Sequence, residues 1–217
     1  MSPAPALLAS SDVTALHDLL LAHPGWPADA VALPPPEEPL RHWIAANHRF
    51  NSLLWAEEDL ARRTLVADSE IAANKRAIDR YNQARNDATE RVDEILLVGL
   101  GLVDADSART DMPVSRAAPE ARLNSETAGS MIDRLSILSL KRRAMREQTM
   151  RRDTDEAHLV LSRGRLAQLE RQRGDLAACL DALLVDAQAG RACFKVYRQF
   201  KMYNDARFNP VLRAERG

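Results

Sequence analysis

The sequence predicts an all-α fold, an antiparallel bundle of about four long helices with a short N-terminal helix and an aromatic and basic C-terminal tail. Only 8 of the 217 residues are glycine, while Ala, Leu, Arg and Glu, which lose little freedom in a helix, are abundant. Hydrophobic residues make up 46% of the chain, enough for a sizeable core. Leucines at three- and four-residue spacing between positions 159 and 183 indicate helices that pack at a shallow angle.

Two segments precede the predicted bundle. Ser11 can cap a short helix that runs to Leu21, where Pro24 and the following glycine end it. Residues 24–39 are rich in proline and read as a linker with polyproline character. We therefore divide the chain into a short helix and linker (1–37), a helical bundle domain (38–212) and a tail (213–217).

The bundle is expected to contain four long helices. The break between the first two, around Ala67–Ser69, is weak, so these two helices are also compatible with one bent rod. Residues 102–122 hold two prolines and many polar residues and are expected to form a mobile loop. Asn124 or Ser125 can cap the third helix, and Asp153 or Thr154 the fourth. The expected ranges are about 38–67, 68–100, 124–152 and 153–190.

Charge and the absence of sorting signals limit the class of protein. The chain carries 30 basic and 31 acidic residues, so no overall field attracts nucleic acid or a membrane surface. No stretch approaches the ~20 apolar residues of a membrane span, and the first residues do not resemble a signal peptide. We expect a cytoplasmic protein without a membrane span, for which nucleic acid is an unlikely partner.

Several polar residues occupy positions where the helical periodicity predicts apolar ones. An unpaired buried charge costs several kcal/mol, so these groups should meet one another, water or a ligand. Two interpretations remain open, a structural hydrogen-bonding network and a ligand-binding cavity. A slip of one residue in the periodicity would instead place several of them in water. The residues are His48, Asn51, Glu58, Asn82, Arg85, Glu126, Ser130 and Asp133.

No complete catalytic or metal-binding signature is present. The Glu-x-x-His pairs of di-iron bundles, the Gly-x-Ser-x-Gly elbow, the Walker loop and the GxGxxG fingerprint are all missing. No transition-metal site is predicted, although Mg²⁺ on Glu58, Glu126 or Asp133 stays a candidate because Mg²⁺ needs only one or two carboxylates plus phosphate. Cys179 beside the leucine stripe reads as inert packing, and Cys193 among basic residues as the more reactive thiol.

Two basic segments have alternative interpretations. The run from Lys141 to Arg152 is either a solvated helix end or a phosphate contact. In the tail, basic residues alternate with aromatic ones, which can stack on and neutralise a nucleotide or phosphosugar, or can pack on the bundle. The tail residues are Arg191, Phe194, Lys195, Tyr197, Arg198, Phe200, Lys201, Tyr203, Arg207 and Phe208.

Four segments together carry a resemblance to a known family. They are His48–Glu58, Lys75–Asp87, Asn124–Leu138 and Phe200–Asp205, the last adding Lys201, Tyr203 and Asn204 to the candidate binding residues. Across residues 40 to 212 the chain resembles an uncharacterised bacterial family, a domain of unknown function often associated with lipopolysaccharide glycosyltransferases. The resemblance implies a role in bacterial surface-glycan assembly on the cytoplasmic side. The chain departs from the family pattern at Arg142–Arg143 and at Ala206.

We weigh two functional hypotheses from different classes. In the first, the protein binds or acts on a phosphosugar or sugar nucleotide. Arg85 and Lys201 then hold phosphate, Glu126 or Asp133 serves as base or Mg²⁺ ligand, and His48 serves as an acid or an orienting group. In the second, it is a non-catalytic accessory protein that docks on a glycosyltransferase or forms a homo-oligomer through its leucine-lined helices. A third hypothesis, a helical enzyme like chorismate mutase, is suggested by Lys75–Arg80, but the spacing does not continue.

Overall fold

The all-α prediction is confirmed by the computed structural model, which describes residues 8–28, 33–198, 202 and 205–215. Two strands of two residues each, β1 (Arg122–Leu123) and β2 (Ala192–Cys193), pair in parallel. Among the described residues, none of the helices is both long enough and apolar enough to cross a membrane. The helices are α1 (Ser10–Ala22), α2 (Pro39–Leu60), α3 (Asp68–Gly99), α4 (Ala105–Ala108), α5 (Ala128–Thr149), α6 (Glu156–Gln188) and α7 (Pro210–Ala214).

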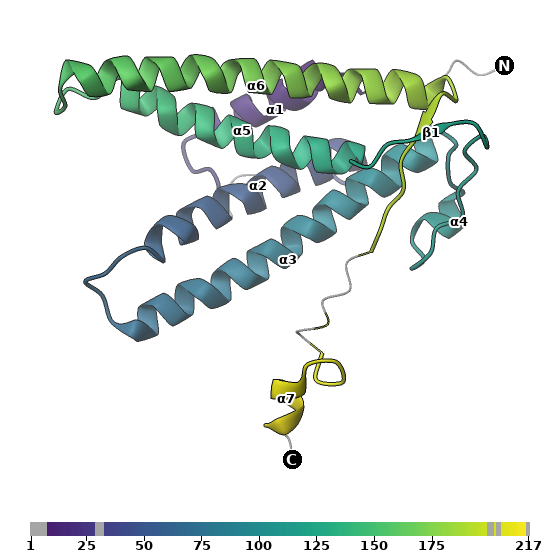
Figure 1. Ribbon diagram of the computed structural model, residues 1–217, viewed down its shortest axis with the longest axis horizontal. Coiled ribbons are helices and arrows are strands. Elements are labelled where there is room, and N and C mark those ends of the chain that lie inside the picture. Colours follow the sequence, from purple (N-terminus) through teal and green to yellow (C-terminus); the bar gives the residue numbers. More distant parts are fainter. Residues whose placement is uncertain (1–7, 29–32, 199–201, 203–204, 216–217) are drawn as a thin grey trace.

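The long helices form two antiparallel hairpins, α2–α3 and α5–α6 (Figure 1). The helices within each hairpin contact each other more extensively than they contact the other hairpin. The hairpins converge near β1 and diverge toward the loops that connect α2 with α3 and α5 with α6 (Figure 1). The four predicted helices therefore form a bundle that is closed at one end and open at the other.

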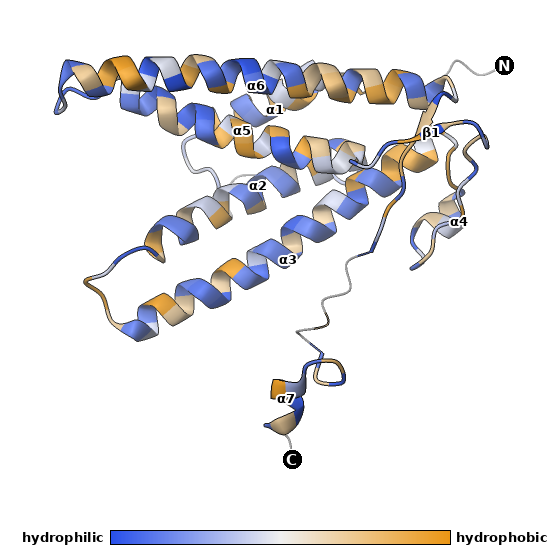
Figure 2. Cartoon of the chain, viewed as in Figure 1, coloured by the Kyte–Doolittle hydropathy of each residue, from blue (hydrophilic) through white to orange (hydrophobic). Residues whose placement is uncertain are grey.

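The hydrophobic core lies at the convergent end. It gathers apolar side chains from α1, the start of α2, the end of α3, the start of α5 and the end of α6, together with Phe194 after β2. Apolar residues are concentrated in the same region, whereas the diverging arms are more polar (Figure 2). In α6 the leucine stripe is buried from Leu176 to Leu184, while Leu159, Leu166 and Leu169 are only partly covered. The open end consequently leaves room for cavities between the hairpins.

Ion pairs and caps attach α1 to the second hairpin. The amide and hydroxyl of Ser10 donate to the Asp181 carboxylate at 2.8 and 2.7 Å. One turn from the end of α1, Asp18 accepts hydrogen bonds from Arg142 of α5 at 3.1 Å and from Arg173 of α6 at 3.0 Å. Part of the basic run after Lys141 thus joins helices rather than only facing solvent.

Several predicted helix boundaries were wrong. The helix expected to reach residue 67 ends at Leu60, so the break before α3 is a real loop. The third helix is capped by Thr127, whose Oγ1 accepts from the Ser130 amide, and not by Asn124 or Ser125. The fourth is capped by Asp155. The 102–122 segment contains α4 and the start of β1, neither of which the sequence predicted.

Cys179 does not have the packed environment that was predicted for it. Cys179 is exposed, and Cys193 is buried in β2. Cys179 adjoins the leucine stripe in sequence but lies on the neighbouring face of α6. Cys193 is enclosed because β2 pairs with β1 at the convergent end.

Candidate functional site

A network of polar side chains joins the two hairpins. Asn47 and Asn51, one turn apart on α2, both donate to Oδ1 of Asp133 on α5 at 2.8 Å. Asn47 also donates to the Thr89 hydroxyl of α3 at 3.0 Å, and Asn51 to the Ser136 hydroxyl of α5 at 3.0 Å. Buried amides and a carboxylate are therefore satisfied by groups from three helices, as burial requires.

A cavity of about 380 Å³ opens beside this network between α2, α3 and α5. Its volume lies within the ~300–1,000 Å³ range of small-molecule sites. Four of the predicted site residues line it: Asn51, Glu58, Asn82 and Arg85. The other lining residues are Leu54, Trp55, Asp59, Arg62, Ile78, Ile137 and Leu140.

Arg85 is the cation of the cavity that is least satisfied by protein groups. Its Nε is buried and has no hydrogen-bonding partner among the described residues. One terminal nitrogen donates to the Asn86 side chain at 3.0 Å, and the nearest carboxylate oxygen, Oδ1 of Asp133, lies 4.0 Å from Nε. That oxygen already accepts from two amides, so Arg85 keeps hydrogen-bonding capacity for a further acceptor.

The acid groups of the cavity differ in environment. Glu58 pairs with Arg62 at 3.0 Å, and both side chains are largely exposed at the rim. Asp133 is not part of the cavity lining and lies behind Asn51 and Arg85, with its side chain 17% exposed. A carboxylate held this way positions the neighbouring amides and balances part of the charge of Arg85.

His48 does not line the cavity, contrary to the sequence-based expectation. It is fully buried, its Nδ1 lies 2.7 Å from the Ser136 hydroxyl, and its ring stacks on His17 of α1 at 4.4 Å between centroids. Burial lowers the pKa of His48 to about 3 and the pKa of His17 well below its usual value. Both rings are neutral at pH 7, so His48 is unsuited to the acid role considered above.

Glu126 and Ser130 also lie away from the cavity. Glu126 precedes the N-cap residue Thr127 and therefore lies outside α5, not on the helix face to which the predicted periodicity assigned it. Its two carboxylate oxygens accept hydrogen bonds from Arg134 at 2.7 and 2.8 Å. Ser130 takes part in the cap with Thr127. Lys201, Tyr203 and Asn204 lie outside the described residues.

The predicted tail contacts are partly structural. Phe194 is in the core, and Arg198 pairs with Glu90 at 2.8 Å and Glu94 at 2.7 Å of α3. Tyr197 is 70% exposed. Phe194 and Arg198 therefore attach the start of the tail to the core and to α3, and none of the described tail residues lines the cavity.

Metal binding gains no support from the geometry. The described part of the chain contains no group of three or more His, Cys, Asp or Glu side chains that could hold a metal ion. Of the three carboxylates considered for Mg²⁺, Glu58 lines the cavity, while Glu126 borders a separate hollow along α5 and α6. The three carboxylates therefore do not converge.

Sequence reasoning missed three members of the polar network, Asn47, Thr89 and Ser136. Asn47 precedes Asn51 by one helical turn, so the i, i+4 spacing of two asparagines was an available signal. Thr89 likewise lies four residues after Arg85 and accepts from Asn47 while donating to the Arg85 carbonyl. Ser136 has no such local signal, because small hydroxyl side chains are common on either face of a helix.

The fold and site define an all-α protein of two helical hairpins with a polar cavity between them. Residues 41–196 match the family described as "Protein of unknown function (DUF4254)", and the chain belongs to this family. The matched segment contains every residue that lines the cavity and excludes α1. No curated protein and no solved structure matches the chain.

Proposed function

We propose that the protein binds a phosphosugar or sugar nucleotide in the cavity between α2, α3 and α5. The observation that carries the proposal is the Arg85 guanidinium, which borders the cavity with a buried Nε that has no partner among the described residues. A phosphate oxygen is a strong acceptor for a guanidinium, and charge-assisted hydrogen bonds of this kind are about twice as strong as neutral ones.

The other lining groups suit the sugar. Amides of Asn51 and Asn82 and the carboxylate of Glu58 are donors and acceptors for hydroxyl groups, and Trp55 supplies a flat apolar face. A cavity lined by apolar groups with a few polar ones is typical of ligand sites. The biological context that we propose, bacterial surface-glycan assembly alongside glycosyltransferases, rests on the family resemblance.

The proposal concerns binding and assigns no reaction. His48 is buried away from the cavity and neutral. Asp133 accepts hydrogen bonds from the two amides of Asn47 and Asn51 and lies near Arg85. Neither group is placed as a proton donor or acceptor at the cavity surface.

The test is a thermal-shift titration with sugar 1-phosphates and sugar nucleotides, with and without Mg²⁺. A ligand at 100 times its dissociation constant stabilises the folded state by about 2.7 kcal/mol, which corresponds to a rise of roughly 5–10 °C in Tm for a domain of this size. Arg85→Ala should abolish the shift given by sugar 1-phosphates and reduce the shift given by sugar nucleotides at the same ligand concentration. Arg80→Ala, an exposed arginine on the same helix, is the matched control and should keep the shift.

Either of two results would refute binding in this cavity. One is the absence of a shift with every compound in the wild-type protein. The other is an equal shift in the Arg85→Ala and wild-type proteins.

The second candidate function is that of an accessory protein that docks on a glycosyltransferase or on its own copy. It is favoured by apolar side chains exposed at the open end of the α5–α6 hairpin, where Met150 is 64%, Val160 57% and Leu161 51% exposed. Sedimentation equilibrium separates this candidate from simple ligand binding, because a stable dimer or higher oligomer would identify a surface for self-association.

A further inference from the structure

A second cavity, of about 400 Å³, lies on the α5–α6 hairpin next to the first. Trp55 of α2 lines both cavities, so the two hollows meet at this ring. The remaining residues come from α5 and α6 and form the floor and rim. They are Lys141, Ala144, Met145, Gln148, Arg165, Gln168, Leu169 and Gln172.

The charges of the second cavity are all positive. Lys141 and Arg165 line it, and none of its lining residues is Asp or Glu. Neither cation forms a hydrogen bond or ion pair with any described residue, in contrast to Arg142 and Arg146 nearby, which both pair with Glu170. Asp175 borders the neighbouring hollow with Lys141 but lies beyond ion-pair distance. Two cations that share one concave surface without a counter-charge favour an anionic ligand.

The uncharged lining indicates what else the ligand carries. Trp55, Met145 and Leu169 offer aromatic and apolar surface, against which a planar ring can stack. Three glutamine amides at positions 148, 168 and 172 provide both donors and acceptors, which suit the edge of a heterocyclic base. The volume is sufficient for a mononucleotide portion but not for a polymer.

We propose that this cavity binds the nucleotide portion of the ligand, with phosphate held by Lys141 and Arg165 and the base packed against Trp55. The inference rests on the proposed function in one respect: the neighbouring cavity then receives the sugar and its own phosphate across Trp55, with that phosphate held by Arg85. The ligand class is accordingly a sugar nucleotide and not a simple sugar phosphate.

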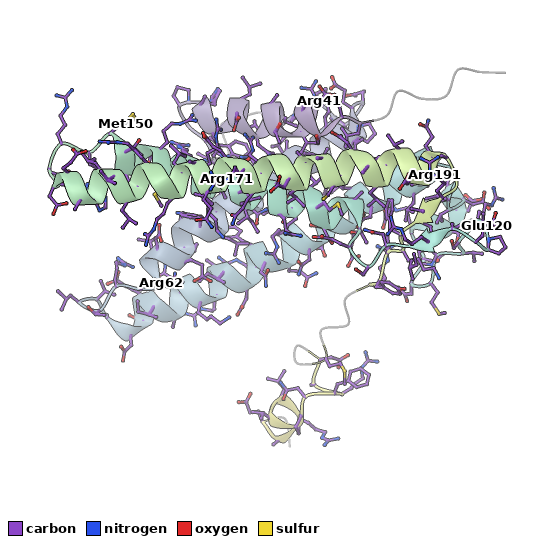
Figure 3. The ribbon with its side chains drawn as sticks, turned by 45° about the horizontal axis from the view of Figure 1, so that its top comes forward. Arg41, Arg62, Glu120, Met150, Arg171 and Arg191 are labelled. Carbon is purple, nitrogen blue, oxygen red and sulfur yellow. The ribbon has the colours of Figure 1, made fainter. Side chains whose placement is uncertain are left out.

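The experiment is isothermal titration calorimetry of the full chain with uridine diphosphate and adenosine diphosphate, which lack the second sugar that a sugar nucleotide carries on its diphosphate. Lys141→Ala and Arg165→Ala should each weaken binding roughly tenfold or more, as expected for one lost hydrogen bond to a charged group. Arg171→Ala is the matched control on α6: Arg171 is exposed, forms no ion pair or side-chain hydrogen bond with any described residue, and is absent from the cavity lining (labelled in Figure 3). Its affinity should equal that of the wild-type protein.

The outcomes separate this inference from the proposed function. Binding of both diphosphates that persists in Arg85→Ala and fails in Lys141→Ala and Arg165→Ala supports the nucleotide subsite. Absence of nucleotide binding, or equal binding in all variants, overturns it. If the nucleotide subsite is overturned but sugar 1-phosphates still bind to the wild type and not to Arg85→Ala, the proposed function stands without the second subsite. Uridine without phosphate should bind far more weakly than the diphosphate, and equal affinity would also contradict the assigned role of the two cations.

Discussion

At Gly129 the backbone of α5 packs directly against α3, and replacement of this glycine by alanine tests how tightly the two hairpins are joined. A Cβ at this position would lie 2.6 Å from the carbonyl oxygen of Thr89 and 2.8 Å from Cγ of Asp93. The first of these neighbours is backbone and cannot rotate away. The Gly129 amide also donates to Oδ1 of Asp93 at 2.6 Å, so a displacement of α5 would weaken a buried hydrogen bond.

These contacts set the expected size of the effect. Forcing a methyl group into a packed contact costs about 1–3 kcal/mol, and weakening a hydrogen bond to a buried carboxyl group costs up to ~1.5–3 kcal/mol. The better helix propensity of alanine offsets at most about 1 kcal/mol. We therefore expect Gly129→Ala to lower the free energy of unfolding by about 2–4 kcal/mol.

Urea unfolding followed by circular dichroism measures this change, provided that the m-value stays constant. Gly174→Ala is the control, because Gly174 lies inside α6 with no atom within 4 Å of an added Cβ. There the same substitution should stabilise the protein by roughly 0.5–1 kcal/mol. If Gly129→Ala were as stable as Gly174→Ala, the close approach of α3 and α5 would not be a feature of the protein in solution.

Two further predictions concern charged groups outside the cavities. Asp18→Asn should lower the free energy of unfolding by about 1–3 kcal/mol in urea titrations, because it leaves two partly buried arginines without their carboxylate. The control Asp79→Asn removes an exposed ion pair and should lower the free energy of unfolding by only a few tenths of a kcal/mol. Equal effects of the two substitutions would contradict the role given to Asp18. Burial raises the pKa of Asp93 from 3.8 to about 7, with Glu90 and Glu94 adding to the rise. Its stabilising contribution is therefore largest below pH 4 and is lost as the pH rises through 7. The free energy of unfolding of the wild type, relative to that of Asp93→Asn, should fall by up to roughly 4 kcal/mol between pH 4 and 8. A difference that does not change with pH would exclude a raised pKa for Asp93.

The helices and much of the cavity were predictable because they depend on local periodicity. Asn51, Glu58, Asn82 and Arg85 interrupt apolar stripes at helical spacing, and these four residues line one cavity. A polar residue on a buried face must have a partner, so its position in the stripe already restricts its surroundings. No knowledge of the neighbouring helix was needed to select these residues.

The errors arise where the outcome depends on a helix end or on a distant segment. Glu126 was assigned to the face of a helix that in fact begins after Thr127, and several residue types can cap a helix almost equally well. Lys141 and Arg165 belong to basic segments that look like any solvated helix surface. Their shared cavity depends on how α5 packs against α6 and where Trp55 meets them. Asp18 contacts arginines 124 and 155 positions away, a distance at which a single sequence carries no signal.

The polar network explains how an open-ended bundle can still hold a defined cavity. At the convergent end the hydrophobic core fixes the hairpins, but toward the open end few apolar contacts join them. Asn47 and Asn51 bridge this region by donating to one carboxylate oxygen of Asp133, and each would leave a buried polar group unpaired if the hairpins separated. That penalty holds α2 against α5 at the cavity wall. Among the side chains that touch this network, Nε of Arg85 and Nε2 of His48 remain without a partner among the described residues, and the proposed ligand anion would supply the acceptor that Arg85 lacks.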